Sequence, residues 1–169
     1  MRNKTITIMA ALAVIFGLLI MTSCGTDEID ISTYADEEIV LAGVSDQEDS
    51  EQEETVSIKQ LKDLDCITKK THSTSDKIGE VKATGPLLET LLEQYGIQLG
   101  DVKRAVFYGK DEYDVRLTGD YLQEHDIILA FGIDGQPLDE ESAPVRVIIP
   151  ESDSAYWIRM VNRIEIEQK

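Results

Sequence analysis

Apolar residues in this chain fall in short runs and alternating stretches, a pattern that predicts many β-strands and few helices. Residues 127–131 form a run that is β-branched and too short for a helix, so we expect a buried strand there. Asp134 and Gly135 follow between apolar flanks, and both tolerate the positive φ of a type I′ turn. The pair therefore predicts a hairpin, and residues 143–150 predict a further strand.

Other stretches alternate between apolar and polar side chains. In residues 113–117 the alternation places Tyr113, Val115 and Leu117 inside and the residues between them outside. Residues 55–64 begin as a strand and continue as a short helix capped by Ser57. The further predicted strands are residues 38–44, 67–73, 104–108 and 157–167.

One helix dominates the prediction. It begins at Pro86, a favoured first-turn residue, and ends at Gly96, a residue type favoured just after a helix. Its apolar stripe consists of Leu87, Leu88, Leu91, Leu92 and Tyr95, which core packing explains. A single helical turn is expected at residues 120–124. Many short strands with one main helix, and no regular alternation of strands and helices, predict an α+β fold.

The N-terminus carries the features of an export signal. Arg2 and Lys4 precede an uncharged apolar run, residues 8–21, that is too short to span a bilayer comfortably. This pattern predicts a signal peptide over residues 1–23. Its end, followed by Cys24, resembles a bacterial lipobox, so we expect Cys24 to carry lipid and to anchor the protein at the extracytoplasmic face of the bacterial cell membrane. The alternative is an uncleaved anchor with an incidental cysteine.

The charge of the chain is strongly negative and unevenly spread. A formal net charge of −17 disfavours binding to nucleic acid or to anionic lipid. Residues 25–54 contain twelve Asp or Glu and neither Lys nor Arg. Such a segment repels itself and buries little, so we expect residues 24–36 to be a solvated acidic tether and residues 45–54 an acidic loop. The length of the chain then leaves one domain, residues 37–169.

Two cysteines and two histidines limit the metal and redox chemistry. If Cys24 carries lipid, Cys66 is the only thiol of the mature chain, which excludes an intramolecular disulfide, a zinc site and a pair of redox cysteines. Cys66 is then expected to be a small apolar residue of the core. Because His72 and His125 have no partners at metal-ligand spacing, the sequence predicts no metal site, and it identifies no catalytic residue.

Four motifs resemble a known family. They are TGPLLETLLEQYG at residues 84–96, DIILAFGIDGQPL at residues 126–138, APVRVIIP at residues 143–150 and RIEI at residues 163–166. Their content and order are similar to the molybdopterin-binding domain of the sulfite oxidase superfamily. The resemblance implies a β-rich fold of mixed sheets with one main helix. It also implies a molybdenum ion held by the pterin and by one cysteine thiolate, a soft ligand suited to this metal.

The chain departs from the family at the metal ligand. Counted from residues 61–64, the position of the ligand cysteine falls near His72 and Ser73, whereas Cys66 stands at the beginning of the same strand. We therefore expect that no cofactor is bound. The alternative is molybdopterin, the molybdenum cofactor, with His72, Ser73 or a repositioned Cys66 as an unusual ligand.

Three residues are candidates for cofactor binding. Arg146 matches a family arginine that lies near the pterin, and Ser73 stands at the ligand position. Arg159 is the one basic residue kept from a family segment that contacts the anionic groups of the cofactor. Arg146 has an open alternative as a surface cation paired with one of the acidic residues at positions 139–141.

Two functions are compatible with these residues. The first is a membrane-anchored lipoprotein whose domain lacks the metal ligand and serves as a non-catalytic binding or interaction module for an unknown small molecule or protein partner. The second is a molybdopterin-dependent oxidoreductase with an unusual ligand. The scaffold does not decide between them, because function depends on the site and not on the fold.

Overall fold

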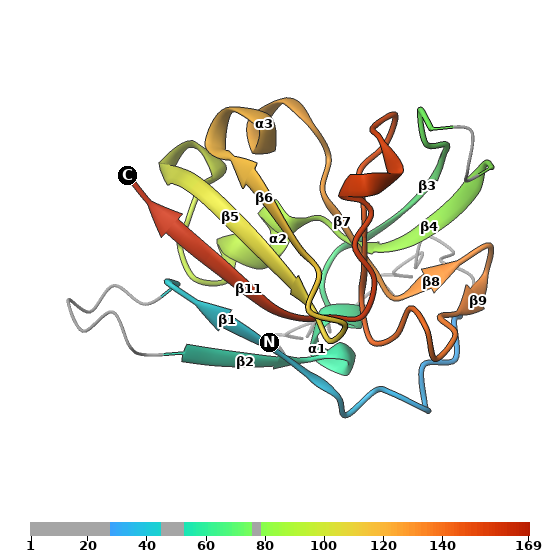
Figure 1. Ribbon diagram of the computed structural model, residues 1–169. Helices are drawn as coiled ribbons and strands as arrows, with labels where there is room; N and C mark the ends of the chain where they lie inside the picture. The colour runs from blue at the N-terminus through green and yellow to red at the C-terminus, as the bar shows by residue number, and fades with distance from the viewer. Residues whose placement is uncertain (1–27, 45–52, 76–78) are drawn as a thin grey trace, which may run out of the picture.

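The computed structural model describes residues 28–44, 53–75 and 79–169, and Figure 1 shows how they are arranged. A five-stranded sheet and a four-stranded sheet form the two sides of the domain, and a two-stranded sheet lies between them. The predicted signal peptide, Cys24 and most of the predicted acidic loop lie outside the described residues. Within the described residues, no helix has the length and apolar character needed to cross a membrane.

The five-stranded sheet has the strand order β2-β1-β11-β5-β6. Its strands are β1 (Glu38–Ala42), β2 (Glu53–Ser57), β5 (Val102–Gly109), β6 (Asp114–Thr118) and β11 (Val161–Gln168). β1 runs parallel to β11, whereas every other pair is antiparallel, so the sheet is mixed. Its inner face buries apolar residues, including Ile39, Leu41, Phe107 and Ile164.

The remaining strands form the two smaller sheets. They are β3 (Cys66–Thr71), β4 (Val81–Pro86), β8 (Gly132–Ile133) and β9 (Gln136–Pro137), then β7 (Ile128–Ala130) and β10 (Arg146–Ile148). β4 approaches β7 so closely that a Cβ atom on Gly85 would lie 2.1 Å from the carbonyl oxygen of Leu129, which only glycine avoids. The predicted hairpin is confirmed, because Asp134 and Gly135 join β8 to β9 with φ of 53° and 76°.

Short helices connect the strands. They are α1 (Ile58–Lys62), α2 (Leu88–Glu93), α3 (Gly119–Glu124) and the 3₁₀ turns η1 (Leu99–Asp101) and η2 (Ser154–Tyr156). The predicted cap of α1 is confirmed: Ser57 Oγ accepts from Gln60 N at 3.2 Å, and Gln60 Oε1 accepts from Ser57 N at 2.8 Å. α2 begins later than predicted, because Pro86 ends β4 in an extended conformation, paired with Cys66.

The structure departs from the sequence prediction in three further places. Tyr113 is 49% exposed and not inside, because β6 begins only at Asp114 and Tyr113 belongs to the preceding turn. The last strand begins at Val161 and not at Trp157, because η2 and a positive φ at Met160 interrupt the extended chain. β4 has no counterpart in the sequence prediction, since its small and polar residues lack a regular alternation. The fold as a whole is β-rich, with mixed sheets and few helices.

The segment before β1 is packed against the domain. We call residues 28–37 the strap, which is the dark blue segment in Figure 1. Ile29, Ile31 and Tyr34 within it are 2%, 5% and 4% exposed. The expectation of a solvated tether therefore does not hold for residues 28–36. These three apolar side chains are buried even though the overall composition of the segment is acidic.

Candidate functional site

The loop after β3, which contains Ser73, is joined to the loop between β10 and β11. Thr74 N donates to Ser152 O at 2.9 Å, and Ser73 Oγ donates to the same carbonyl at 3.2 Å. Ser75 Oγ lies 3.1 Å from Ser73 Oγ and 2.5 Å from Ser154 Oγ. We call Ser73, Ser75, Ser152 and Ser154 the serine junction. It fixes the end of β3 to the segment that contains η2.

The hydroxyl of Ser73 is fully used within the serine junction. A hydroxyl has one hydrogen to donate and two lone pairs to accept with. Ser73 Oγ uses its one hydrogen to donate to Ser152 O. In the contact between Ser73 Oγ and Ser75 Oγ, Ser75 is therefore the donor and Ser73 the acceptor. Ser75 N is the second donor to Ser73 Oγ, at 3.1 Å. Ser73 is also only 6% exposed, so its oxygen has neither a free lone pair nor an open approach for a ligand.

Trp157 connects the serine junction to Arg146. Its Nε1 donates to Ile149 O at 2.8 Å and to Ser152 Oγ at 3.1 Å. On the other side, the guanidinium carbon of Arg146 lies 6.0 Å from the centre of the indole ring, within the range of a cation–π contact. Two of the three candidate residues, Ser73 and Arg146, therefore contact the same segment, residues 152–157, although they are far apart in the sequence.

Arg146 has an unused hydrogen-bond donor. Its Nε atom is buried and has no hydrogen-bond partner among the described residues. A buried N–H without an acceptor costs free energy, so such an atom is unusual in a folded protein. The predicted alternative does not apply, since none of the ion pairs of the described residues joins Arg146 to the acidic residues at 139–141.

Arg159 adds positive charge to the surroundings of Arg146. Burial lowers the pKa of Arg146, and repulsion from Arg159 lowers it further, while the charge of Asp139 raises it. A guanidinium stays protonated in spite of such a shift. Arg159 itself is 46% exposed, and its Nη1 lies 3.6 Å from an exposed oxygen of Glu141. We call these two arginines, the half-buried Arg146 and the exposed Arg159, the cationic region.

Cys66 lies at the far end of β3 from the serine junction. In the β3–β4 ladder Cys66 is opposite Pro86, and Thr71 is opposite Val81. Five residues of strand at about 3.3 Å each separate Cys66 from Thr71 by about 17 Å. Burial raises the pKa of the Cys66 thiol to about 11, so it is protonated at neutral pH. Cys66 is therefore neither a thiolate nor near the expected ligand position.

Residues 35–169 match the family described as oxidoreductase molybdopterin binding domain. The chain belongs to this family. A similar solved structure is the sulfane dehydrogenase SoxCD from Paracoccus pantotrophus, with a TM-score of 0.66 and 18% sequence identity over 80% of this chain. The likeness extends over only 39% of the SoxCD chain, and at this identity it concerns the fold alone. No curated protein matches the chain. The superfamily inferred from the four motifs is thereby confirmed.

The donor atoms of this family member suit the anionic groups of the cofactor but not its molybdenum ion. Ser73 offers a hydrogen-bonded hydroxyl, and His72, which is exposed, offers an imidazole, at the position where the resemblance to the family implies a soft thiolate. The described residues contain no group of three or more His, Cys, Asp or Glu that could hold a metal ion. The cationic region of Arg146 and Arg159, in contrast, suits an anionic group such as a phosphate.

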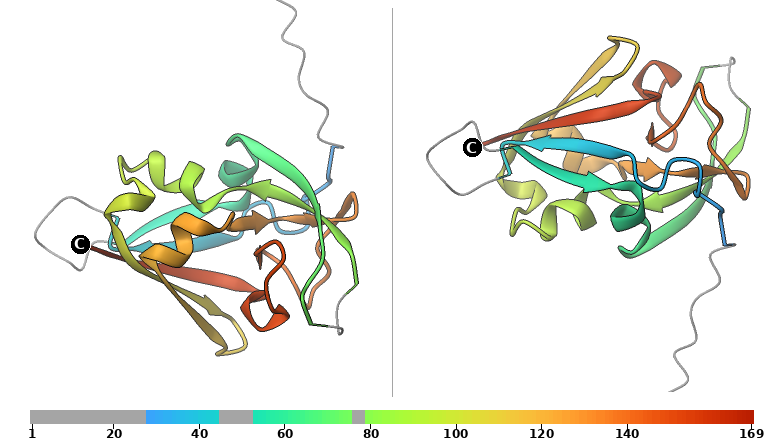
Figure 2. Two further views of the ribbon diagram at one scale, coloured as in Figure 1. Left: turned by 90° about the horizontal axis from the view of Figure 1, so that it is seen from above. Right: turned by 90° about the horizontal axis from the view of Figure 1, so that it is seen from below.

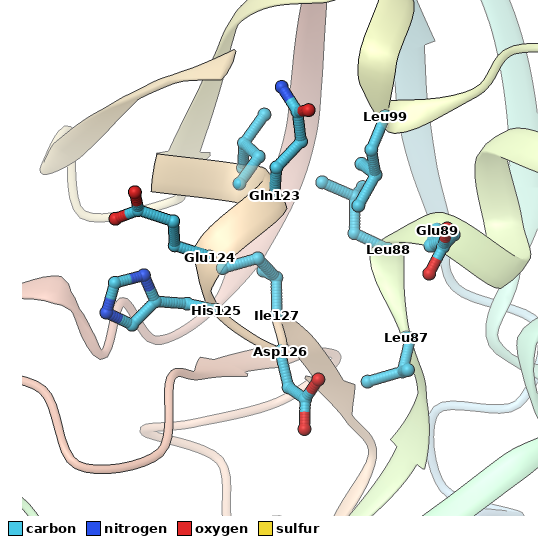
Figure 3. Close-up of a pocket in the computed structure, with 10 residues that line it drawn as sticks. Leu87, Leu88, Glu89, Leu99, Gln123, Glu124, His125, Asp126 and Ile127 are labelled. Atoms are coloured by element: carbon cyan, nitrogen blue, oxygen red, sulfur yellow. The ribbon is translucent and has the colours of Figure 1, made fainter. Parts of the chain in front are cut away.

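A pocket on another part of the surface offers no better site. Figure 3 shows it, with Leu87, Leu88 and Leu99 on one side and residues 123–127 on the other. Its volume of about 100 Å³ is far below that of a cofactor site. His125, which borders it, stacks on Tyr121 at 4.0 Å between ring centres, and its Nδ1 lies 3.1 Å from Tyr121 O, as expected for a histidine that caps a helix end.

Four residues of the site were not found from the sequence: Trp157, Ser75, Ser152 and Ser154. The three serines lie in two loops. The composition of these segments predicts loops but does not indicate which residues the loops contact. Their pairing joins positions 79 residues apart, a relation that no local pattern contains. Trp157 is the only tryptophan of the chain, and that rarity was the one available signal.

Proposed function

We propose that this protein is a lipid-anchored extracytoplasmic module of the family that binds a small anionic ligand at Arg146 and performs no molybdenum chemistry. The observation that carries the proposal is the closed hydrogen-bond network of Ser73, which supplies no free donor oxygen where the metal ligand would stand. Arg146 supports the class of ligand, because a half-buried cation with a buried and unused N–H favours an anion. The lipobox sequence that ends at Cys24 supports attachment to the membrane.

A molybdopterin-dependent oxidoreductase is the second candidate. Membership of the family favours it, and so does Arg146, whose free Nε suits the phosphate of a pterin. In this case Arg146 and Arg159 would hold the anionic end of the cofactor, and the cofactor would supply the redox chemistry. This function requires a protein ligand for molybdenum, and Ser73 would first have to leave its hydrogen bonds.

Metal analysis separates the two functions. The protein is exported by a bacterial host that makes the molybdenum cofactor, then assayed for molybdenum by elemental analysis and for pterin by fluorescence. We expect no stoichiometric molybdenum. A near-equimolar content that disappears in Ser73→Ala would establish the oxidoreductase, and disappearance in Cys66→Ser would instead identify Cys66 as the ligand.

An anion titration tests the proposed ligand class directly. Because Trp157 is the only tryptophan and lies against Arg146, its fluorescence reports on an anion at the guanidinium. Inorganic phosphate should change this fluorescence in a saturable manner, and Arg146→Gln should abolish the change. The matched control is Arg116→Gln, which removes an exposed arginine paired with Asp114 and should leave the titration as it is. A saturable change that persists in Arg146→Gln would refute the assignment.

A further inference from the structure

We infer that two copies of this protein associate through the free edge of β6, which forms an antiparallel pair with β6 of the second copy. This interaction surface goes beyond the proposed ligand site and does not depend on it. Four features of β6 support the inference: backbone groups that face no described strand, the absence of the usual protection of an edge strand, a charge pattern that is complementary to itself, and two exposed tyrosines close to the edge.

β6 forms one edge of the five-stranded sheet. β5 is its neighbour on one side, and no described strand lies on the other. Both views of Figure 2 show the hairpin of β5 and β6, in shades of yellow, at the outer margin of this sheet. Tyr113 O accepts from the last residue of β5 at 2.9 Å, so the hydrogen bonds to β5 continue at every second residue, Val115 and Leu117. The backbone N–H and C=O groups of Asp114 and Arg116 therefore point to the free edge.

The chain after β6 turns away from this edge. Gly119, the first residue of α3, packs so closely on the start of β5 that an added Cβ atom would lie 2.1 Å from Val102 O. α3 therefore begins on the β5 side of the strand and leaves the free edge open. The side chains of Arg116 and Asp114 are 64% and 36% exposed, so a second molecule can reach both of them.

The other edge strands of the two larger sheets carry features that hinder pairing. β3 contains Lys69 and Lys70, and β9 is only two residues long and ends in Pro137; lysine, proline and short length are common protections of sheet edges. β2 contains Glu53 and Glu54 and no basic residue, so it repels a second copy of itself. β6 contains neither lysine nor proline, and its register with β5 is unbroken.

The charges of β6 match those of an antiparallel second copy. Asp114 and Arg116 share the outer face of the sheet, where Arg116 Nε lies 3.0 Å from Asp114 Oδ2. When Val115 lies opposite Val115 of the second copy, each charged residue lies opposite one of the other sign and exchanges two backbone hydrogen bonds with it. A shift of two residues would instead oppose like charges. A two-fold axis at Val115 is therefore the expected arrangement, and two-fold symmetry is the commonest form of a dimer.

Two tyrosines extend the surface beside the edge. Among the described residues, Tyr113 and Tyr156 are the large apolar side chains that are exposed, at 49% and 39%. They lie close together, since Tyr113 Oη donates to Ala155 O at 3.0 Å. In the register centred on Val115, Tyr113 lies opposite Leu117 of the second copy. The dimer thus covers an aromatic ring that the single chain exposes.

Sedimentation equilibrium tests whether the dimer forms. A contact of two five-residue strands is at the small end of protein interfaces, so we expect a weak dimer that depends on concentration. The full chain is purified in a density-matched non-ionic detergent and measured from about 5 to about 500 μM, a range suited to weak association. In 0.15 M salt the Debye length of about 8 Å limits the repulsion between chains of net charge −17 to close approach. The mean protein mass should rise with concentration from one chain toward two.

Charge reversals test the strand and its register. Arg116→Asp opposes acidic side chains and Asp114→Arg opposes basic ones, so each variant alone should raise the dissociation constant at least about tenfold. An equimolar mixture of the two variants restores opposite charges across the interface and should dimerise as the parent does. The matched control is Lys103→Asp on β5, which makes the same change of charge at a side chain that is also 64% exposed. It should leave the dissociation constant unchanged.

Three results would overturn the inference. A chain that remains a monomer over the whole concentration range does not use this edge. A dimer that Arg116→Asp leaves unchanged forms through another surface. Loss of the dimer in both variants without recovery in their mixture contradicts the register centred on Val115. Recovery in the mixture also shows that the variants are folded, because an unfolded chain presents no strand edge.

Discussion

Arg163 and Arg146 are two arginines of the same domain in opposite surroundings. Arg163 stands on the outer face of the five-stranded sheet, where its Nη1 lies 2.7 Å from Glu53 and its Nε lies 2.8 Å from Glu165. These hydrogen bonds raise the pKa of Arg163. Arg146, on β10, has a buried Nε without a partner, and burial lowers its pKa.

The difference separates an arginine whose donors are matched within its own sheet from one with an unused donor, which is the feature that the proposed anion binding depends on. The donors of Arg163 are matched by carboxylates of its own sheet, so its interactions are complete when the chain is folded. The buried N–H of Arg146 costs stability in the free protein, and an anion that accepts from it would recover that cost on binding. An arginine of this kind is therefore expected to favour binding at the expense of stability, while Arg163 is expected to do the reverse.

A core substitution sets the scale for this comparison. Leu91 is 1% exposed and belongs to the buried stripe of α2 together with Leu88 and Leu92. Leu91→Ala should lower the free energy of unfolding by about 2–5 kcal/mol, because it removes buried methyl groups and leaves a cavity. Urea denaturation followed by circular dichroism measures the change. A loss below about 1 kcal/mol would mean that α2 packs differently from the structure.

The second prediction reverses the usual sign of a buried substitution. Arg146→Met keeps an unbranched side chain on Trp157 but removes the unpartnered N–H, so the free energy of unfolding should rise by about 1–3 kcal/mol in the absence of ligand. The same urea titration measures it. Arg159→Met, at an exposed position, is the control and should change stability by less than about 0.5 kcal/mol. A clear loss of stability in Arg146→Met would show that its donors are satisfied in solution.

The sequence predicts those parts of the structure that depend on residues close together in the sequence. The cap at Ser57 and the hairpin at Asp134 and Gly135 follow from local backbone chemistry, and both are present in the structure. The strap was not predicted, because its buried isoleucines stand within an acidic composition that favours a solvated segment. The average composition of a segment does not show which of its side chains are buried, because burial depends on the contacts of each side chain.

The candidate site was predictable in part. The family motif identified Arg146, and its spacing located Ser73, but neither told how the two are surrounded. Arg146 Nε has no partner because none of the described residues places an acceptor within hydrogen-bond reach of it, and the hydroxyl of Ser73 is fully used because of its contacts with Ser75 and Ser152. These are tertiary relations, so they become visible only when the chain is folded.

The third prediction concerns the paired arginine. Arg163→Gln removes the hydrogen bonds to Glu53 and Glu165, and it should lower the free energy of unfolding by less than about 1 kcal/mol. The effect is small because both carboxylates are more than one-third exposed, and water replaces the lost partner. Urea denaturation at neutral pH in 0.1 M salt measures it. A loss as large as that of Leu91→Ala would mean that the ion pairs are a major source of stability.

The smallest effect is the dependence of that loss on pH. The hydrogen bond from Arg163 lowers the pKa of Glu165 below its ordinary value of 4.5. A carboxyl group with a lowered pKa in the folded state stabilises the protein at pH values above its unfolded pKa, and this contribution disappears as the pH falls through the folded pKa. The stability difference between the parent and Arg163→Gln should therefore be constant from pH 7 to about 5 and shrink below about pH 4.5. The difference for Arg146→Met should change less, because its missing hydrogen bond involves no carboxylate. Urea titrations of the three proteins between pH 3 and pH 7 test the contrast, and an Arg163→Gln difference that grows toward low pH would contradict the proposed pairing.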